Sequence, residues 1–133
     1  MSKPIASIMQ TQATTVDMDA TLEQVEAILF QHRLSAVPVI ERPHGAVLGI
    51  ISARDLAQAR HDKRKAQEVH AWEICSYKPV EVGPGATLSD VARMMVAHDI
   101  HHVLVTDNNA IVGIVSALDF VRQFIEDDAG TSA

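Results

Sequence analysis

The sequence predicts an α+β fold, in α/β layers, made of two tandem β-α-β-β-α repeats related by pseudo-twofold symmetry. The first observation is a motif that occurs twice, as GIISARD at residues 49–55 and as GIVSALD at residues 113–119. The second is the tripeptide Ala-Thr-Leu, which occurs at residues 20–22 and again at 86–88. One copy alone has too few strands to bury a stable core, so we expect the two copies to pack into one body.

The register of the duplication defines the repeats. An offset of 66 residues carries Val16 onto Val82 and Val25 onto Val91, and it falls to 64 at Asp119, the counterpart of the first motif's aspartate. A shorter turn in the second copy explains the slip, because turns tolerate changes of length. We therefore place repeat 1 at residues 1–62, repeat 2 at 63–126 and a disordered acidic tail at 127–133.

Apolar periodicity assigns the elements of each repeat. Thr21 and Thr87 precede apolar residues at helical spacing, so we expect each threonine to cap a helix. A second helix is expected to follow Asp55 and Asp119. Apolar, β-branched runs predict strands at 14–16, 36–40, 79–82 and 102–106, with a turn at 42–45 or 107–109 leading to each repeat's last strand.

Composition limits the class of protein and its partners. The chain has 133 residues, of which 47% are apolar and only 4% aromatic, so its core should be aliphatic. A formal charge of −6 argues against nucleic acid or an anionic membrane as a partner. Cys75 is the only cysteine, which excludes an intrachain disulfide. Neither a signal-peptide core nor a membrane-spanning apolar run is present, so we expect a cytoplasmic protein.

The repeated motif places a serine and an aspartate where a strand meets a helix. Ser52 and Ser116 can cap the helices, and free backbone N–H groups at such a start favour an anion such as phosphate. Asp55 and Asp119 can accept hydrogen bonds from both hydroxyls of a ribose. The alternative is purely structural, with the serines as caps and the aspartates as first-turn charges.

The chain resembles a pair of CBS domains, also called a Bateman module. Three features carry the resemblance: the duplicated Gly-Ile-Ile/Val-Ser-x-x-Asp motif, the segments at 32–39 and 98–105 that precede it, and the leading segment Ile-Ala-Ser-Ile-Met at 5–9. The resemblance covers nearly the whole chain. It implies a regulatory unit that binds AMP, ADP, ATP or S-adenosylmethionine in two clefts between its repeats. We expect no enzyme activity and no required cofactor.

The resemblance also implies which residues form each cleft. In the family, the aspartate of one repeat is used with the middle strand of the other. Asp55 would then bind ribose beside Ile100, His101 and His102, and Asp119 would do so beside Leu34, Ser35 and Ala36. Thr14 and Val80 would line the base pocket or, alternatively, belong to the core.

The two predicted clefts differ in charge. Arg54, next to Asp55, can bind phosphate with its guanidinium, whereas Leu118 stands at the matching position. One of His101 and His102 can add a further donor, but not both, because neighbouring strand residues face opposite sides. We therefore expect the Asp55 cleft to be the better phosphate site, and the Asp119 cleft to be weaker, empty or suited to a less charged adenosyl ligand. The alternative for Arg54 is a solvated side chain.

Other functions are less consistent with the sequence. No nucleophile is paired with a base, and the histidines at 98–102 lack a further metal ligand at suitable spacing, so neither catalysis nor metal binding is expected. The basic run at 60–65 is either a solvated linker or a contact for phosphates or an acidic partner. We expect a homodimer, formed through the helices after the two aspartates, that modulates an effector protein in trans. The alternative function is a dimerisation or interaction module that binds no ligand.

Overall fold

The computed structural model describes residues 3–11, 14–41 and 45–131, which fold into two compact units. One unit is Thr14–Pro79, and the other combines Met1–Ala13 with Val80–Ala133. Each unit has its own sheet and its own buried cluster of side chains. The two units are therefore described separately.

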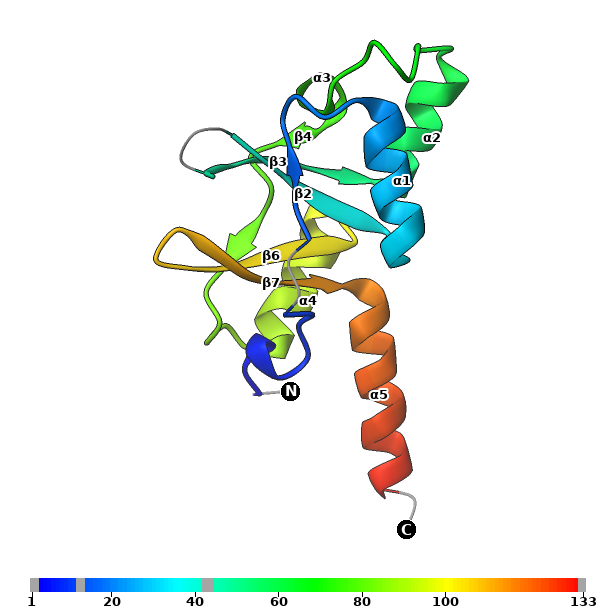
Figure 1. Cartoon of the computed structure of the whole chain (residues 1–133). Helices are drawn as coiled ribbons and strands as arrows, with labels where there is room; N and C mark the ends of the chain where they lie inside the picture. Colours follow the sequence, from blue (N-terminus) through cyan, green and yellow to red (C-terminus); the bar gives the residue numbers. More distant parts are fainter. Residues whose placement is uncertain (1–2, 12–13, 42–44, 132–133) are drawn as a thin grey trace. The chain divides into compact units, whose positions relative to one another are not determined.

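The unit Thr14–Pro79 is built on a four-stranded sheet. Its elements are β1 (Val16–Asp17), α1 (Leu22–His32), β2 (Ala36–Ile40), β3 (Val47–Ser52), α2 (Ala53–His61), α3 (Ala71–Ile74) and β4 (Ser76–Tyr77). The strand order is β1-β2-β3-β4, parallel in the first pair and antiparallel in the other two. Helices α1 and α2 contact one another beside this sheet (Figure 1).

The second unit repeats this plan with a three-stranded sheet. Its elements are the short 3-10 helix η1 (Ile5–Ser7), β5 (Glu81–Val82), α4 (Leu88–His98), β6 (His102–Asp107), β7 (Ala110–Ser116) and α5 (Ala117–Thr131). The pair β5–β6 is parallel and β6–β7 is antiparallel. The predicted order β-α-β-β-α is thus confirmed in both copies.

Local sequence explains where the first helix of each copy begins and ends. Thr21 Oγ1 accepts a hydrogen bond from the Gln24 N–H at 3.2 Å, and Thr87 Oγ1 accepts one from the Asp90 N–H at 3.1 Å. Each helix ends where the next residue has a left-handed backbone, with φ of 54° at Arg33 and 51° at the equivalent residue 99. Both predicted threonine caps are confirmed.

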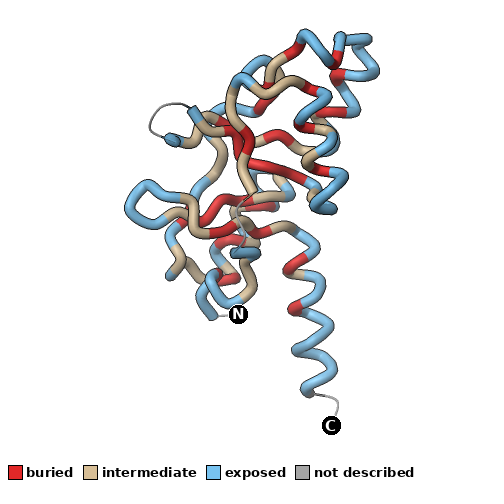
Figure 2. Tube along the Cα trace, viewed as in Figure 1, coloured by how far each residue is buried: buried red, intermediate tan, exposed pale blue. Residues whose placement is uncertain are grey.

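The core of each unit is aliphatic, as the composition predicted. In the first unit Val37 and Ile51, on the two middle strands, are completely buried together with Val25 of α1. The buried stretches follow the middle strands and the helix faces turned toward them (Figure 2). Full burial of one such side chain stabilises the fold by about 2 kcal/mol, so packing of these strands against α1 and α4 holds each unit together.

The segment that leads into each repeat packs on the unit that contains the other repeat. The Ile5 N–H donates to the Ala86 carbonyl at 2.7 Å, and the Ala71 N–H donates to the Ala20 carbonyl at the same distance. Ile5 is completely buried in the second unit. The compact units therefore do not coincide with the sequence repeats, whose limits at 1–62 and 63–126 stay a prediction.

The structure corrects two details and leaves one open. Helix α5 continues to Thr131, so a tail without regular structure from residue 127 is wrong for residues 127–131. Strand β1 begins at Val16, later than the predicted 14–16, and β5 lies within the predicted 79–82. Most of the turn predicted at 42–45 lies outside the described residues.

Candidate functional site

The first motif forms a capping box at the start of α2, and in the second motif Ser116 donates hydrogen bonds to Asp119 at the start of α5. Ser52 Oγ accepts a hydrogen bond from the Asp55 N–H at 3.2 Å. In return, Asp55 Oδ2 accepts from the Ser52 N–H at 2.8 Å and from the Ser52 hydroxyl at 3.0 Å. In the second unit, Asp119 Oδ2 accepts from the Ser116 N–H at 2.8 Å and from its hydroxyl at 3.1 Å. Serine and aspartate thus orient one another in both units.

The two aspartates differ in what contacts their second oxygen. Asp119 Oδ1 accepts from the side-chain amide of Gln10 at 3.1 Å and from Arg122 Nη1 at 3.4 Å, and the Asp119 side chain is only 4% exposed. Asp55 is half-buried, and its Oδ1 accepts no hydrogen bond from any residue that the structure describes. Asp55 is therefore the carboxylate with an oxygen available to a ligand.

The predicted middle-strand residues lie against the helix start of their own unit. The Ser35 carbonyl accepts from the Ala53 N–H at 2.9 Å, and Ala36 pairs with Ser52 across β2 and β3. In the second unit the His101 carbonyl accepts from the Ala117 N–H at 2.9 Å, and residue 102 pairs with residue 116. Combining the aspartate of one unit with the middle strand of the other stays a prediction.

Arg54 is exposed at the second position of helix α2, where its N–H has no acceptor within the helix. Leu118, its counterpart, is 53% exposed. His101 is exposed just before β6, and His102, the first residue of β6, is half-buried. The phosphate role of Arg54 and the histidines stays a prediction.

The residues predicted for the base pockets also contribute to packing. Ala36 is buried, and Leu34 packs against the core of the first unit. Val80 and Ile100 pack against the core of the second. Thr14 is half-buried just before β1. A packing role is therefore present for most of them, and their contact with a base stays a prediction.

Sequence reasoning missed Gln10 and Arg122, which contact Asp119. Arg122 follows Asp119 by three residues on the same helix, a spacing at which side chains meet. Gln10 is 109 residues away in the chain and reaches Asp119 only because its segment pairs with β7 at Ile114. The helical spacing of Arg122 could have been found in the sequence, but the contact of Gln10 could not.

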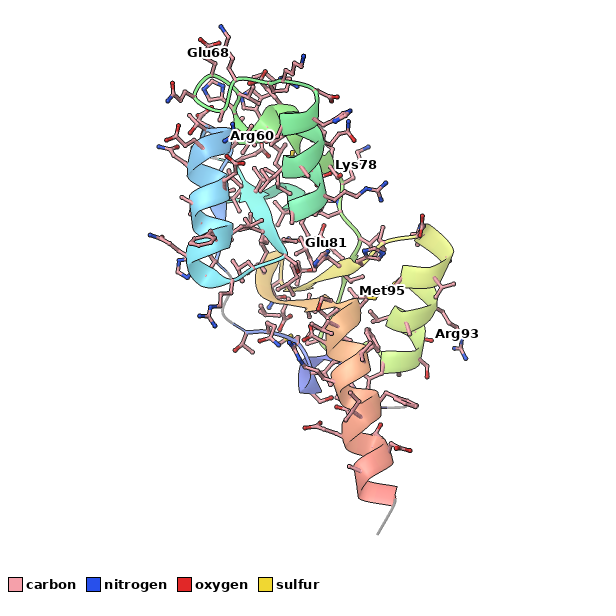
Figure 3. The ribbon with its side chains drawn as sticks, turned by 90° about the vertical axis from the view of Figure 1, so that its right-hand side faces the viewer. Arg60, Glu68, Lys78, Glu81, Arg93 and Met95 are labelled. Atoms are coloured by element: carbon pink, nitrogen blue, oxygen red, sulfur yellow. The ribbon has the colours of Figure 1, made fainter. Side chains whose placement is uncertain are left out.

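The basic run at 60–65 forms ion pairs within its own unit. Arg60 of α2 donates to both carboxylate oxygens of Glu26 on α1, at 3.0 and 2.6 Å, and this pairing raises the pKa of Arg60. Figure 3 labels Arg60 where α1 and α2 lie side by side. Arg64 reaches Glu73 at 3.4 Å, and Lys65 lies 4.0 Å from Glu68. These pairs favour the interpretation of a solvated linker.

The part of the chain that the structure describes holds neither a metal-ligand cluster nor a membrane-spanning helix. Within residues 3–11, 14–41 and 45–131, no group of histidine, cysteine and carboxylate side chains could hold a metal ion. In the same part of the chain, no helix combines the length and apolar character needed to cross a membrane.

The duplicated fold agrees with the family that the sequence matches. The family model of the CBS domain matches residues 5–62 and 71–126. The chain belongs to the CBS domain family. The resemblance on which the site predictions rest is thereby confirmed, and so is the architecture of two tandem CBS repeats.

Individual relatives extend this result. The chain is 29% identical to the CBS domain-containing protein YhcV of Bacillus subtilis, over 96% of this chain and 91% of YhcV. It is 30% identical to the uncharacterized protein MJ0188 of Methanocaldococcus jannaschii, of which it spans only 46%. The crystal structure of the CBS domain pair of protein MJ0100, in complex with 5′-methylthioadenosine and S-adenosyl-L-methionine, is similar with a TM-score of 0.84. The two sequences are 25% identical, and the match covers 92% of this chain and 99% of the MJ0100 domain pair.

Proposed function

We propose that this chain is a regulatory module that binds an adenosine-containing ligand, of the AMP, ADP, ATP or S-adenosylmethionine class, between its two CBS repeats. The observation that carries the proposal is Asp55, which Ser52 orients at the start of α2 while its Oδ1 stays without a donor among the described residues. The ligands of the similar pair from MJ0100 both contain adenosine, which supports this class.

The chemistry of the Asp55 site suits a ribose next to a phosphate. An ionised carboxylate is purely an acceptor, so Oδ1 of Asp55 can accept from a ribose hydroxyl while Oδ2 stays held by Ser52. Arg54 adds an exposed guanidinium and a first-turn backbone N–H, which has no acceptor within the helix, at the same helix start. A phosphorylated nucleotide would use both groups, whereas S-adenosylmethionine would use the carboxylate alone.

Regulation follows if the ligand contacts both repeats. A ligand that binds one arrangement of the repeats better than another shifts the population toward it, by no more than the difference in binding free energy. We propose that an effector protein recognises the favoured arrangement in trans. No catalytic step, cofactor or nucleic acid is part of this proposal, and its setting is the cytoplasm.

A homodimer is also part of the proposal. Helix α5 exposes Leu118, Val121, Phe124 and Ile125, with exposed fractions from 51% to 71%. An apolar face of this kind is typical of a surface that binds another protein. In α2, by contrast, the apolar residues Leu56 and Ala59 are buried, so this helix is less suited to the dimer contact than expected. We therefore assign the dimer contact to α5.

The alternative is an interaction module that binds no ligand, and thermal unfolding separates the two. The midpoint is measured with AMP, ADP, ATP, NADH and S-adenosylmethionine in turn, for the wild type, Asp55→Ala and Asp19→Ala. A ligand that binds only the folded state raises the midpoint. We expect a rise in the wild type and in Asp19→Ala, which changes an exposed aspartate of the same unit, and none in Asp55→Ala.

Each variant is compared with its own midpoint in the absence of ligand, because Asp55 also caps α2. If no ligand at millimolar concentration shifts the wild type, the sensor function is wrong and the interaction module replaces it. A rise that persists in Asp55→Ala would mean that the ligand binds elsewhere.

A further inference from the structure

The second aspartate already holds two donors from its own unit. Gln10 is fixed by two backbone hydrogen bonds with Ile114, at 2.9 and 3.0 Å, which direct its side-chain amide to Asp119 Oδ1 at 3.1 Å. Arg122, one helical turn further along α5, adds its guanidinium at 3.4 Å. With Oδ2 bonded to Ser116, both oxygens of this carboxylate are occupied.

The matching positions of the first unit hold residues that do not donate hydrogen bonds to Asp55. Ser76 occupies the place of Gln10, since it pairs with Ile50 of β3 as Gln10 pairs with Ile114 of β7. A serine side chain ends one bond beyond Cβ, so it is too short to reach Asp55 as Gln10 reaches Asp119. Gln58 occupies the place of Arg122, but its amide donates to Asp62 at 3.1 Å.

We propose that Gln10 and Arg122 close the Asp119 site, so that the chain binds one adenosine ligand, at Asp55, and uses Asp119 for structure. This inference rests on the proposed function and specifies which of its two sites works. A ligand hydroxyl would have to displace the Gln10 amide and the Arg122 guanidinium from a side chain that is 4% exposed. The neighbouring Arg122, whose side chain is 63% exposed, also offsets part of the carboxylate's charge, and a pair with an exposed partner adds a small contribution to the bond from Gln10.

The test exchanges these residues between the two units. In the double variant Gln10→Ser and Arg122→Gln, the second unit receives the residues of the first. In the reciprocal double variant Ser76→Gln and Gln58→Arg, the first unit receives those of the second. Equilibrium dialysis with radiolabelled ATP and, in parallel, S-adenosylmethionine measures the number of ligands bound per chain and their affinity.

We expect one ligand per chain for the wild type and two for the first double variant. The reciprocal variant should bind its ligand at least tenfold more weakly than the wild type. Circular dichroism of each variant establishes that it is folded. If the double variant Gln10→Ser and Arg122→Gln does not fold, the single variant Gln10→Ser replaces it.

Three results would overturn the inference. Two ligands per wild-type chain would mean that the Asp119 site is open. One ligand per chain in the wild type and in the folded Gln10→Ser variants would mean that Gln10 and Arg122 do not close it, although the proposed function would stand. Failure of every protein to bind either ligand would reject the proposed function and the inference together.

Discussion

The helix starts at Asp55 and Asp119 have the same backbone arrangement, but the side chains around them differ. The serine N–H lies 2.8 Å from Oδ2 in both, and each strand pairs with its neighbour in the same register. The difference arises from side chains on other segments, because Gln10 reaches one aspartate whereas Ser76 stands at the matching place of the other. The duplication has thus kept the scaffold of a site in both units while the contacting residues determine whether it is available.

The largest expected difference between the units concerns their motif glycines. A Cβ at Gly49 would lie 2.5 Å from the Ser76 carbonyl oxygen. One at Gly113 would first meet the Met9 sulfur at 2.6 Å, and would meet a backbone atom, the Gln10 carbonyl oxygen, only at 3.0 Å. Backbone cannot move as cheaply as a flexible methionine. We expect Gly49→Ala to lower the free energy of unfolding by about 3 kcal/mol and Gly113→Ala by about 1 kcal/mol, measured by urea denaturation.

Gly85→Ala is the control for this comparison, because a Cβ there meets no atom within 4 Å. Equal losses at Gly49 and Gly113 would show that the segment leading into the first repeat is held as rigidly as the one leading into the second.

The next difference concerns the stabilities of the aspartate variants without ligand. Asp119→Ala loses the bonds to Gln10 and Arg122 as well as those to Ser116, whereas Asp55→Ala loses only those to Ser52. Because Asp119 loses more hydrogen bonds to its charged carboxylate than Asp55 does, we expect losses of about 3 kcal/mol for Asp119→Ala and about 1 kcal/mol for Asp55→Ala, measured by urea denaturation.

Gln10→Ala provides an independent measure, since it removes one of the extra bonds and should account for part of the difference. A loss for Asp55→Ala as large as that for Asp119→Ala would mean that Asp55 has structural contacts comparable to those of Asp119.

The sequence alone predicted the backbone elements around the two aspartates, but not the side-chain contacts that distinguish them. The strand at 36–40 and both threonine caps follow from short-range patterns, and the structure confirms them. The contact of Gln10 with Asp119 depends on how a distant segment packs, which a local pattern does not encode. The end of α5 was missed for another reason, since an acidic run resembles a tail although Gln123 donates to Asp127 at 2.8 Å within the helix.

The two threonine caps should resemble each other more than the aspartates do. Each threonine accepts one backbone hydrogen bond at the same point of an equivalent helix. We expect Thr21→Ala and Thr87→Ala each to cost about 1 kcal/mol, with equal shifts in the urea midpoint. Gln24→Ala should cost less, because it removes only the return bond from the Thr21 N–H, and a difference above about 1 kcal/mol between the threonines would contradict the equivalence.

The smallest expected difference is a dependence on pH that arises in one unit. The His70 N–H donates to Glu73 Oε2 at 2.7 Å, and this bond holds the pKa of Glu73 below its ordinary value of 4.5. A carboxyl whose pKa is lowered on folding stabilises the fold above that ordinary value, and the contribution disappears as pH falls through the lowered pKa.

The counterpart of Glu73 in the other unit is Ser7, which does not titrate in this range. The stability difference between wild type and Glu73→Gln should therefore shrink as pH falls below 4.5 in urea titrations, whereas Ser7→Ala should change stability equally over the same range. A wild-type advantage that grows on acidification would show that protonated, rather than ionised, Glu73 is the form that the His70 N–H stabilises.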